Sequence, residues 1–184
     1  MDRSIPAVII AVVLIGIFVL MLRSWKRRTR RDASLAAGYP APAEPGRELA
    51  SVPALYVATT PRDLPLERLA IKGLGFRAKA TLTVTDAGLW MLLAGENGVF
   101  IPADAIDLLE PATWTIDRVV ETDGLLVLGW RLATGERDAV AASSPDVDSY
   151  FRIVDPADRA RVSDAIRSIA PQAANPAELP ESEA

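Results

Sequence analysis

The chain has 184 residues, which leaves room for one folded domain once an apolar N-terminal stretch is set aside. It contains no Cys and no His, which excludes disulfide bonds, thiol catalysis, zinc fingers and histidine acid–base chemistry. The formal net charge is −4, but basic residues gather directly after the apolar stretch and acidic residues dominate the remainder.

Residues 5–22 read IPAVIIAVVLIGIFVLML and carry no charge. At about 1.5 Å per residue this run spans roughly 27 Å as a helix, close to the roughly 30 Å hydrocarbon core of a bilayer. A cleaved signal peptide would carry its positive charge before the apolar core and a small-residue site after it, and here the order is reversed. The run therefore predicts a retained transmembrane helix over 5–22.

Residues 23–31, RSWKRRTRR, carry six basic side chains, whereas residues 1–4 are neutral overall. Basic flanks stay on the cytoplasmic side of a span. This predicts a single-pass protein of the cell membrane with residues 1–4 outside and a cytoplasmic C-terminal domain. The plain interpretation is a topology signal and anchor, and the sharper one is lipid signalling. Contact with the interface and with anionic lipid is expected from Arg23, Trp25, Lys26, Arg27, Arg28, Arg30 and Arg31.

Two segments have linker composition. Residues 32–50 are rich in Pro and Ala and predict an extended spacer, and residues 171–184 predict a disordered acidic tail. Residues 33–184 hold 13 basic and 22 acidic residues, a net charge of −9. The acidic balance predicts that membrane lipid is contacted only through the anchor and its flank, and that no basic face binds nucleic acid.

Between these segments, residues 51–170 are dominated by strand signals. Short apolar or alternating runs are separated by turn residues, and Asn97-Gly98 predicts a hairpin turn with positive φ. Near the end, Asp155 and Pro156 have the pattern of a helix N-cap and first turn. The helix is expected to end before Pro171, with an apolar stripe made of Ala160, Val162, Ile166 and Ile169.

Strands followed by one helix imply an antiparallel sheet or barrel that a helix covers at one end. The segments GLGFRAKATLTVTDAGLWM, VFIPADAI and GLLVLGWRL resemble a bacterial pleckstrin-homology-like (PH-like) domain in small single-pass membrane proteins of Gram-positive bacteria with GC-rich genomes. The resemblance covers about residues 50–170 and the anchor. It implies a bent antiparallel barrel of about seven strands capped by the C-terminal helix, with no catalytic residue, cofactor or metal ligand to transfer.

Motifs for catalysis or cofactor binding are weak. Residues 73–78, GLGFRA, match the dinucleotide fingerprint G-x-G-x-x-A, but a β pattern follows where a helix is needed, so a turn entering a strand is favoured. Asp104, Asp107 and Glu110 are better explained as a solvated face than as a metal site. Serine catalysis lacks a histidine base, and no motif surrounds the lysines that could replace it. We therefore expect no enzyme activity, no cofactor and no metal.

Three tryptophans, Trp90, Trp114 and Trp130, fall in strand-like segments, where packing is the usual role. A partner groove lined by Trp114 or Trp130 is the functional alternative, because PH-like barrels can bind a peptide along a strand edge. The sequence thus predicts a membrane-anchored cytoplasmic interaction or scaffold module that binds an unknown protein. The alternatives are a lipid-headgroup sensor and an accessory subunit of a membrane transport or other assembly.

Overall fold

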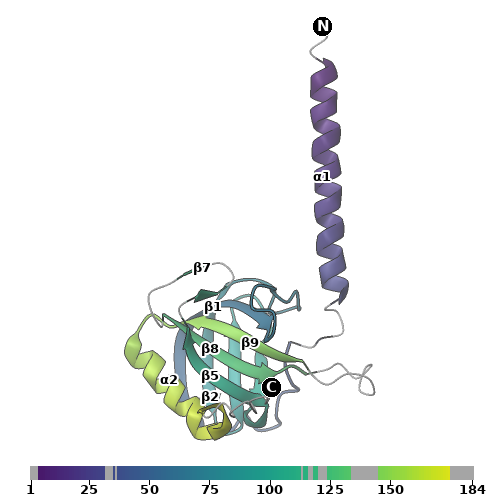
Figure 1. Ribbon diagram of the computed structural model, residues 1–184. Helices are drawn as coiled ribbons and strands as arrows, with labels where there is room; N and C mark the ends of the chain where they lie inside the picture. Colours follow the sequence, from purple (N-terminus) through teal and green to yellow (C-terminus); the bar gives the residue numbers. More distant parts are fainter. Residues whose placement is uncertain are drawn as a thin grey trace, which may run out of the picture.

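The computed structural model describes residues 4–31, 35, 37–112, 114–115, 118–119, 124–133 and 145–174. Helix α1 (Ser4–Arg31) stands apart from a β domain (Figure 1). It contains both the predicted span and the basic segment. Residues Val8–Arg27 have a mean hydropathy of 2.6, and none of them is buried. By length and composition this helix can cross a membrane, as predicted.

The domain is built on a seven-stranded antiparallel sheet in the order β4-β3-β2-β1-β9-β8-β5. A two-stranded hairpin, β6 (Trp114–Thr115) with β7 (Arg118–Val119), stands between β5 and β8 in the chain. The seven strands are β1 (Glu48–Pro61), β2 (Ala78–Thr85), β3 (Gly88–Leu93), β4 (Val99–Pro102), β5 (Ile106–Ala112), β8 (Leu125–Arg131) and β9 (Asp146–Arg152).

Strand β1 joins the two halves of the sheet. Its first part pairs with β2 and its last part with β9, with a register shift between Tyr56 and Ala58. Burial alternates along the first part, whereas every residue from Tyr56 to Thr60 is buried. One face of the first half therefore meets water, while the second half is covered on both faces, as expected where a sheet folds over itself.

Helix α2 (Pro156–Ile169) closes the domain at one end of the sheet (Figure 1). The carboxylate of Asp155 accepts a hydrogen bond from the backbone N–H of Ala157 at 2.8 Å, which confirms the predicted N-cap. Val162 and Ile166 are buried against the strands, and the helix ends before Pro171. The predicted fold, a transmembrane-type helix followed by a PH-like bent antiparallel sheet with a C-terminal helix, is confirmed.

Several boundaries differ from the sequence prediction. Strand β1 begins at Glu48, inside the predicted spacer, and Tyr39 forms an isolated bridge with Phe100 of β4. The 3₁₀ helix η2 (Pro171–Ala174) packs on β5, and Gln172 Nε2 donates to the carbonyl oxygens of Ala103 and Ile106 at 3.0 and 2.9 Å. These segments are ordered by contacts distant in sequence, which their composition does not reveal. Residues 32–34, 36 and 175–184 lie outside the described part.

Two local predictions were also inaccurate. Ala160 is exposed, so the buried stripe of α2 begins at Val162. The β3–β4 hairpin forms as expected, but its positive φ of 85° belongs to Gly95, and Gly98 has no positive φ. Gly98 instead allows close packing, since an added Cβ would lie 2.9 Å from a methyl carbon of Leu92.

Candidate functional site

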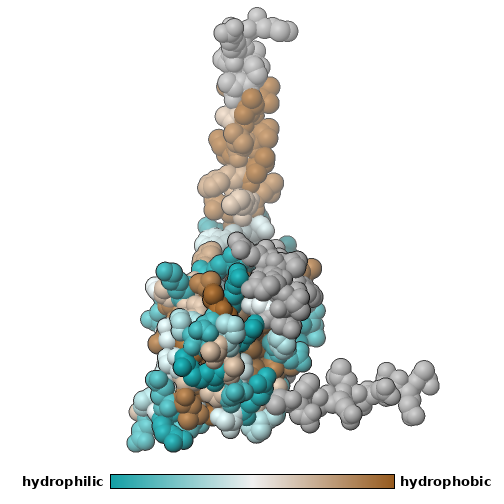
Figure 2. Space-filling view, turned by 90° about the vertical axis from the view of Figure 1, so that its left-hand side faces the viewer, coloured by the Kyte–Doolittle hydropathy of each residue, from teal (hydrophilic) through white to brown (hydrophobic). Residues whose placement is uncertain are grey.

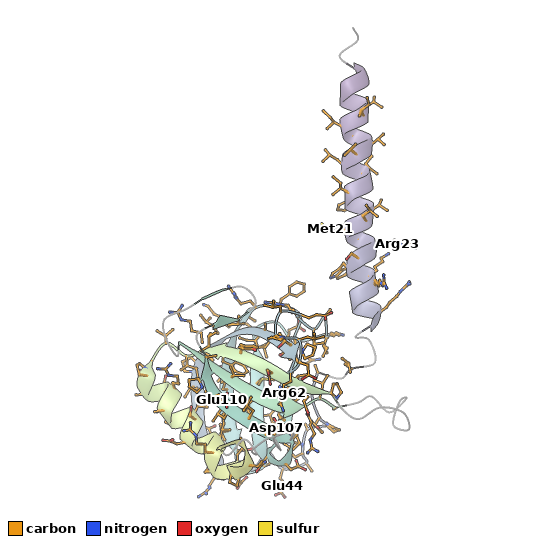
Figure 3. All side chains as sticks on the ribbon, in the orientation of Figure 1. Met21, Arg23, Glu44, Arg62, Asp107 and Glu110 are labelled. Carbon is orange, nitrogen blue, oxygen red and sulfur yellow. The ribbon has the colours of Figure 1, made fainter. Side chains whose placement is uncertain are left out.

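The basic flank continues α1 beyond its apolar part, and Met21 and Arg23 mark the transition (Figure 3). In the space-filling view, the brown apolar surface of the helix gives way to hydrophilic colours where it meets the domain (Figure 2). Four basic side chains share one side of the helix with Val19 and Leu22, namely Arg23, Lys26, Arg27 and Arg30. The side chains of Arg28 and Arg31 lie outside the described part.

Trp25 is oriented toward the domain. Its side chain is exposed, and it lines a cavity of about 380 Å³ together with the long connection between β1 and β2. We call this connection, residues 62–77, the β1–β2 loop. Other residues that line the cavity are Lys72, Gly73 and Phe76 of the loop and Glu96 of the β3–β4 hairpin. The end of the predicted span and the tip of the loop are therefore neighbours.

The β1–β2 loop is well anchored but carries large apolar side chains on its outside. Leu69, Ile71 and Leu74 are buried in the core. A turn at Lys72–Leu74, with φ of 92° at Gly73, then leads into β2. This agrees with the interpretation of the G-x-G motif as a turn entering a strand. Leu64, Leu66 and Phe76 remain exposed.

A hydrogen-bonded path through the core holds the end of the loop. Trp130 Nε1 donates to Ser149 Oγ at 3.0 Å, and the Ser149 and Thr59 hydroxyls are 2.8 Å apart. The Tyr56 hydroxyl lies 2.8 Å from Thr59 Oγ1 and donates to the carbonyl oxygen of Leu74 at 2.7 Å. All five residues are fully buried. We call this path the neutral chain.

The two ends of the neutral chain have fixed roles. An indole N–H can only donate and a carbonyl oxygen can only accept, so Trp130 is the donor at one end and Leu74 the acceptor at the other. The Tyr56 hydroxyl is the donor toward both the carbonyl oxygen of Leu74 and Thr59 Oγ1. Burial raises the pKa of Tyr56 well above its ordinary range, although its hydrogen bond with Thr59 acts in the opposite direction. The side chains of the neutral chain therefore stay uncharged at physiological pH.

The start of the loop is held by charge. Arg62 forms a two-pronged pair with Asp107, with Nη2–Oδ1 at 2.6 Å and Nη1–Oδ2 at 3.1 Å (Figure 3). Its Nε donates to Asp148 Oδ1 at 3.2 Å, and Asp146 Oδ2 lies 3.9 Å from Nη1. We call these four residues the Arg62 cluster. Burial raises the pKa of Asp148, while the hydrogen bond and charge of Arg62 act to lower it.

Gly129 of β8 makes room for this cluster. A Cβ at Gly129 would lie 2.5 Å from Arg62 Nη2 and 2.5 Å from Leu108 Cβ. Asp107 is thus an ion-pair partner rather than a purely solvated acid, and Glu110 on the same strand is exposed. Among the described residues, no group of three or more acidic side chains could hold a metal ion.

The structure describes the side chain of only one of the two tryptophans predicted to line a partner groove. Trp130 is fully buried between the sheet and its covering elements, so in this structure its ring packs in the core and does not line a surface groove. The backbone of Trp114 pairs with Val119 in the β6–β7 hairpin, and its side chain lies outside the described part. A groove at Trp114 stays a prediction.

Comparison with known families agrees with this architecture. The family described as bacterial PH domain-like matches residues 35–167. The chain belongs to the bacterial PH domain-like family. PH-like domains of this kind are in general non-enzymatic interaction modules. The match begins at Leu35, which agrees with the packing of the residues before β1 against the domain.

Other comparisons add little. No curated protein matches the chain. Eighteen chains of solved structures match it, and one is from a structure titled "The 8S snRNP Assembly Intermediate". That similarity has 12% sequence identity and a TM-score of 0.45, and covers 80% of this chain and 97% of the other. A similarity with this sequence identity and TM-score supports no conclusion about function.

Sequence reasoning missed both the neutral chain and the Arg62 cluster. Their partners are far apart in sequence, since Thr59 meets Ser149 and Arg62 meets Asp107. The one available signal was the group Asp146, Asp148 and Ser149 within a run that otherwise reads as a strand. Polar side chains inside a buried strand indicate that partners lie nearby.

Proposed function

We propose that this protein is a single-pass cell-membrane protein that holds a non-catalytic PH-like interaction module at the cytoplasmic face. The observation that carries the proposal is the apolar surface of α1. Its side chains from Val8 to Leu22 are exposed, and the core of the domain is complete without them. An apolar surface of this extent is not stable in water, and a bilayer removes it from water along its whole length.

The proposed orientation follows from charge. Arg23, Lys26, Arg27 and Arg30 follow the apolar part on one face of α1, where the positive-inside rule retains them on the cytoplasmic side. The domain is then cytoplasmic. Attachment to the membrane raises its effective concentration for any partner on the same surface, which makes even a weak interaction useful.

Binding of a protein by strand addition is favoured at β4. This edge already accepts an extended segment, since the backbone N–H of Tyr39 donates to the carbonyl oxygen of Phe100 at 2.9 Å. The other outer strand, β5, carries the exposed charge of Glu110 and is packed against η2, and both oppose strand addition. We therefore place the peptide-binding edge at β4, with the segment before β1 as its internal competitor.

Anchoring and orientation can be tested together. The full chain should resist alkaline carbonate extraction from membranes, and a reporter fused after Ala184 should be active only in the cytoplasm. Replacing Leu14 and Ile15 with Arg should release the chain into the carbonate supernatant, because two charges at the centre of a span are costly. A wild-type chain released by carbonate, or a reporter active outside the cytoplasm, would contradict the proposal.

The interaction can be tested by proximity labelling in cells. The full chain should label a set of proteins that a chain truncated after Arg31 does not label, since both share the anchor and only one has the domain. Identical labelling by the two would mean that the anchor alone determines the neighbourhood.

A further inference from the structure

The segment before β1 shows what kind of chain the edge of β4 accepts. We call residues 37–46 the strap. The backbone N–H of Tyr39 donates to the carbonyl oxygen of Phe100 in β4, and the Tyr39 hydroxyl donates to that of Arg131 at the end of β8, at 2.9 and 3.0 Å. A segment of another protein that adds to β4 has to take the place of the strap.

Gly38 of the strap is required by space rather than by backbone conformation. It is not among the glycines with a positive φ. A Cβ at this position would lie 2.8 Å from Val99 Cγ1, and 3.0 and 3.2 Å from the backbone oxygen and nitrogen of Phe100. A valine methyl group can turn away, but the backbone of a paired strand cannot. Glycine therefore lets the strap approach β4 closely.

The residue after Gly38 adds an aromatic contact. Tyr39 is half-buried, and its side chain packs against the hydrophobic core. Pro40 follows, and a residue before proline is confined to extended backbone conformations, which suit a segment that lies along a strand. Glycine followed by an aromatic residue is thus the pattern with which the strap fits this edge.

The strap leaves part of its site unfilled. A cavity of about 220 Å³ lies beside Gly38, and its other lining residues include Lys72 of the β1–β2 loop and Glu96 and Asn97 of the β3–β4 hairpin. Atoms that line a gap lose dispersion contacts on that side. A partner segment that reaches into the cavity gains contacts that the strap lacks, so it can displace the strap.

We infer that the protein partner of this domain contributes an extended segment in which glycine is followed by an aromatic residue, and that this segment replaces the strap on β4. The strap is then an internal ligand that keeps the edge occupied until the partner is near. The inference rests on the strand addition at β4 proposed above and adds the sequence pattern that the edge selects. A competitor attached through a short connection has an effective concentration in the millimolar range. The partner therefore has to be concentrated on the same membrane.

A peptide with the sequence of residues 35–46 tests this pattern outside the chain. A fluorophore at its C-terminus reports binding to the full-length chain in lipid nanodiscs through anisotropy. Gly38→Leu in the chain opens the edge, and Ala43→Leu is the matched control, because Ala43 is exposed on the same segment. Far-ultraviolet circular dichroism verifies the fold of each variant. Tyr39→Ser is a second variant that opens the edge, and it replaces Gly38→Leu if that chain does not fold.

We expect the peptide to bind the opened chain about tenfold or more tightly than the wild-type or Ala43→Leu chain, in which the strap competes. Introducing Gly38→Leu or Tyr39→Ser into the peptide should weaken binding about tenfold, through a clash in one case and a lost ring contact in the other. Ala43→Leu in the peptide should leave binding unchanged. Absence of binding to the opened chain, equal affinity of opened and wild-type chains, or equal affinity of the parent and Gly38→Leu peptides would overturn the inference.

The oligomeric state of the chain tests a different occupant of the edge. If straps are exchanged between two copies, the wild-type chain is a dimer in detergent and Gly38→Leu makes it a monomer. That result also contradicts the inference, because a second copy then occupies β4. Failure of the peptide experiment is distinguished from failure of the proposed function by proximity labelling. A difference in labelling between the full and truncated chains would show that the domain still recruits proteins, through another sequence pattern.

Discussion

Two networks hold the two ends of the β1–β2 loop, and they use opposite chemistry. The Arg62 cluster fixes the start of the loop with charges that water can partly reach, since the side chain of Arg62 is 32% exposed. The neutral chain fixes the end of the loop with uncharged groups that are fully buried. Both networks depend on β8 and β9.

The register of these two strands explains the separation. Gly129 pairs with Asp148, while Trp130 pairs with Val147 and lies diagonally opposite Ser149. Successive side chains of a strand point to opposite faces. Asp148 therefore faces outward to Arg62, and its neighbour Ser149 faces inward to the neutral chain. One strand pair supplies a charged network on its outer face and a neutral one on its inner face.

The difference between the Arg62 cluster and the neutral chain shows where the domain tolerates charged side chains. A buried ion pair has to recover the cost of desolvating both partners, and the two-pronged pairing of Arg62 with Asp107 at a partly exposed position keeps that cost low. A neutral chain in which every donor meets an acceptor can be buried completely. Substitutions on the two faces should therefore differ in size and in pH dependence.

The largest loss of stability is expected at Trp130, the first donor of the neutral chain. Trp130→Ala should destabilise the full chain in detergent by about 3–5 kcal/mol, because it leaves a large cavity in the core and removes the first hydrogen bond of the chain. Thermal unfolding followed by far-ultraviolet circular dichroism measures this change. Trp90→Ala is the control, since Trp90 is only partly buried and stacks on Phe100. A loss at Trp90 as large as that at Trp130 would contradict the assignment of Trp130 to the core.

The second effect should depend on pH. Burial raises the pKa of Asp148 in the folded protein above its ordinary value of 3.8, so the folded state binds more protons just above that pH, and stability falls as pH rises through the window. Arg62 opposes this loss. Arg62→Gln should therefore cost about 2 kcal/mol near neutral pH, less than a fully buried pair would, and clearly less at pH of about 4.

Midpoints of thermal unfolding at the two pH values would reveal this effect. Arg161→Gln is the matched control, because Arg161 pairs with Asp158 on the surface of α2 at 2.6 Å. Its loss should be close to zero at both pH values. If the cost of Arg62→Gln does not change with pH, then Asp148 is not held in the charged form by that guanidinium.

The smallest effect is expected from one hydroxyl. Tyr56→Phe should cost about 1 kcal/mol, since the carbonyl oxygen of Leu74 and Thr59 Oγ1 both lose their hydrogen bond from the Tyr56 hydroxyl. Unlike the loss at Arg62, this cost should be the same at acidic and neutral pH. Amide hydrogen exchange should also become faster at Lys72–Gly75, where the neutral chain is hydrogen-bonded to the β1–β2 loop.

Tyr39→Phe is the control for that hydroxyl. The Tyr39 hydroxyl donates to the carbonyl oxygen of Arg131 at 3.0 Å at an exposed position, where water can replace it. An equal cost in the two variants, or unchanged exchange in the loop of Tyr56→Phe, would mean that the neutral chain does not restrain the β1–β2 loop.

The sequence by itself determined the parts that depend on local pattern. Eighteen uncharged residues predict a helix long enough to span a membrane, the six basic residues after it predict an orientation, and alternation with turn residues predicts a mainly β domain. The N-cap at Asp155 was predictable because a capping bond reaches only two residues along the chain. The bent antiparallel barrel with its C-terminal helix was implied by the resemblance to a PH-like domain rather than by any single pattern, and the order of its strands was not predicted.

Only the tertiary structure decided which polar side chains meet. Thr59 and Ser149 are 90 residues apart in the chain, and Arg62 and Asp107 are 45 apart. The same limit hid the exposure of Lys72 and Arg77 on the β1–β2 loop, because net charge averages over residues that folding places on different faces. Local sequence specifies a residue's own backbone preference, whereas the neighbours of its side chain depend on how distant strands pair.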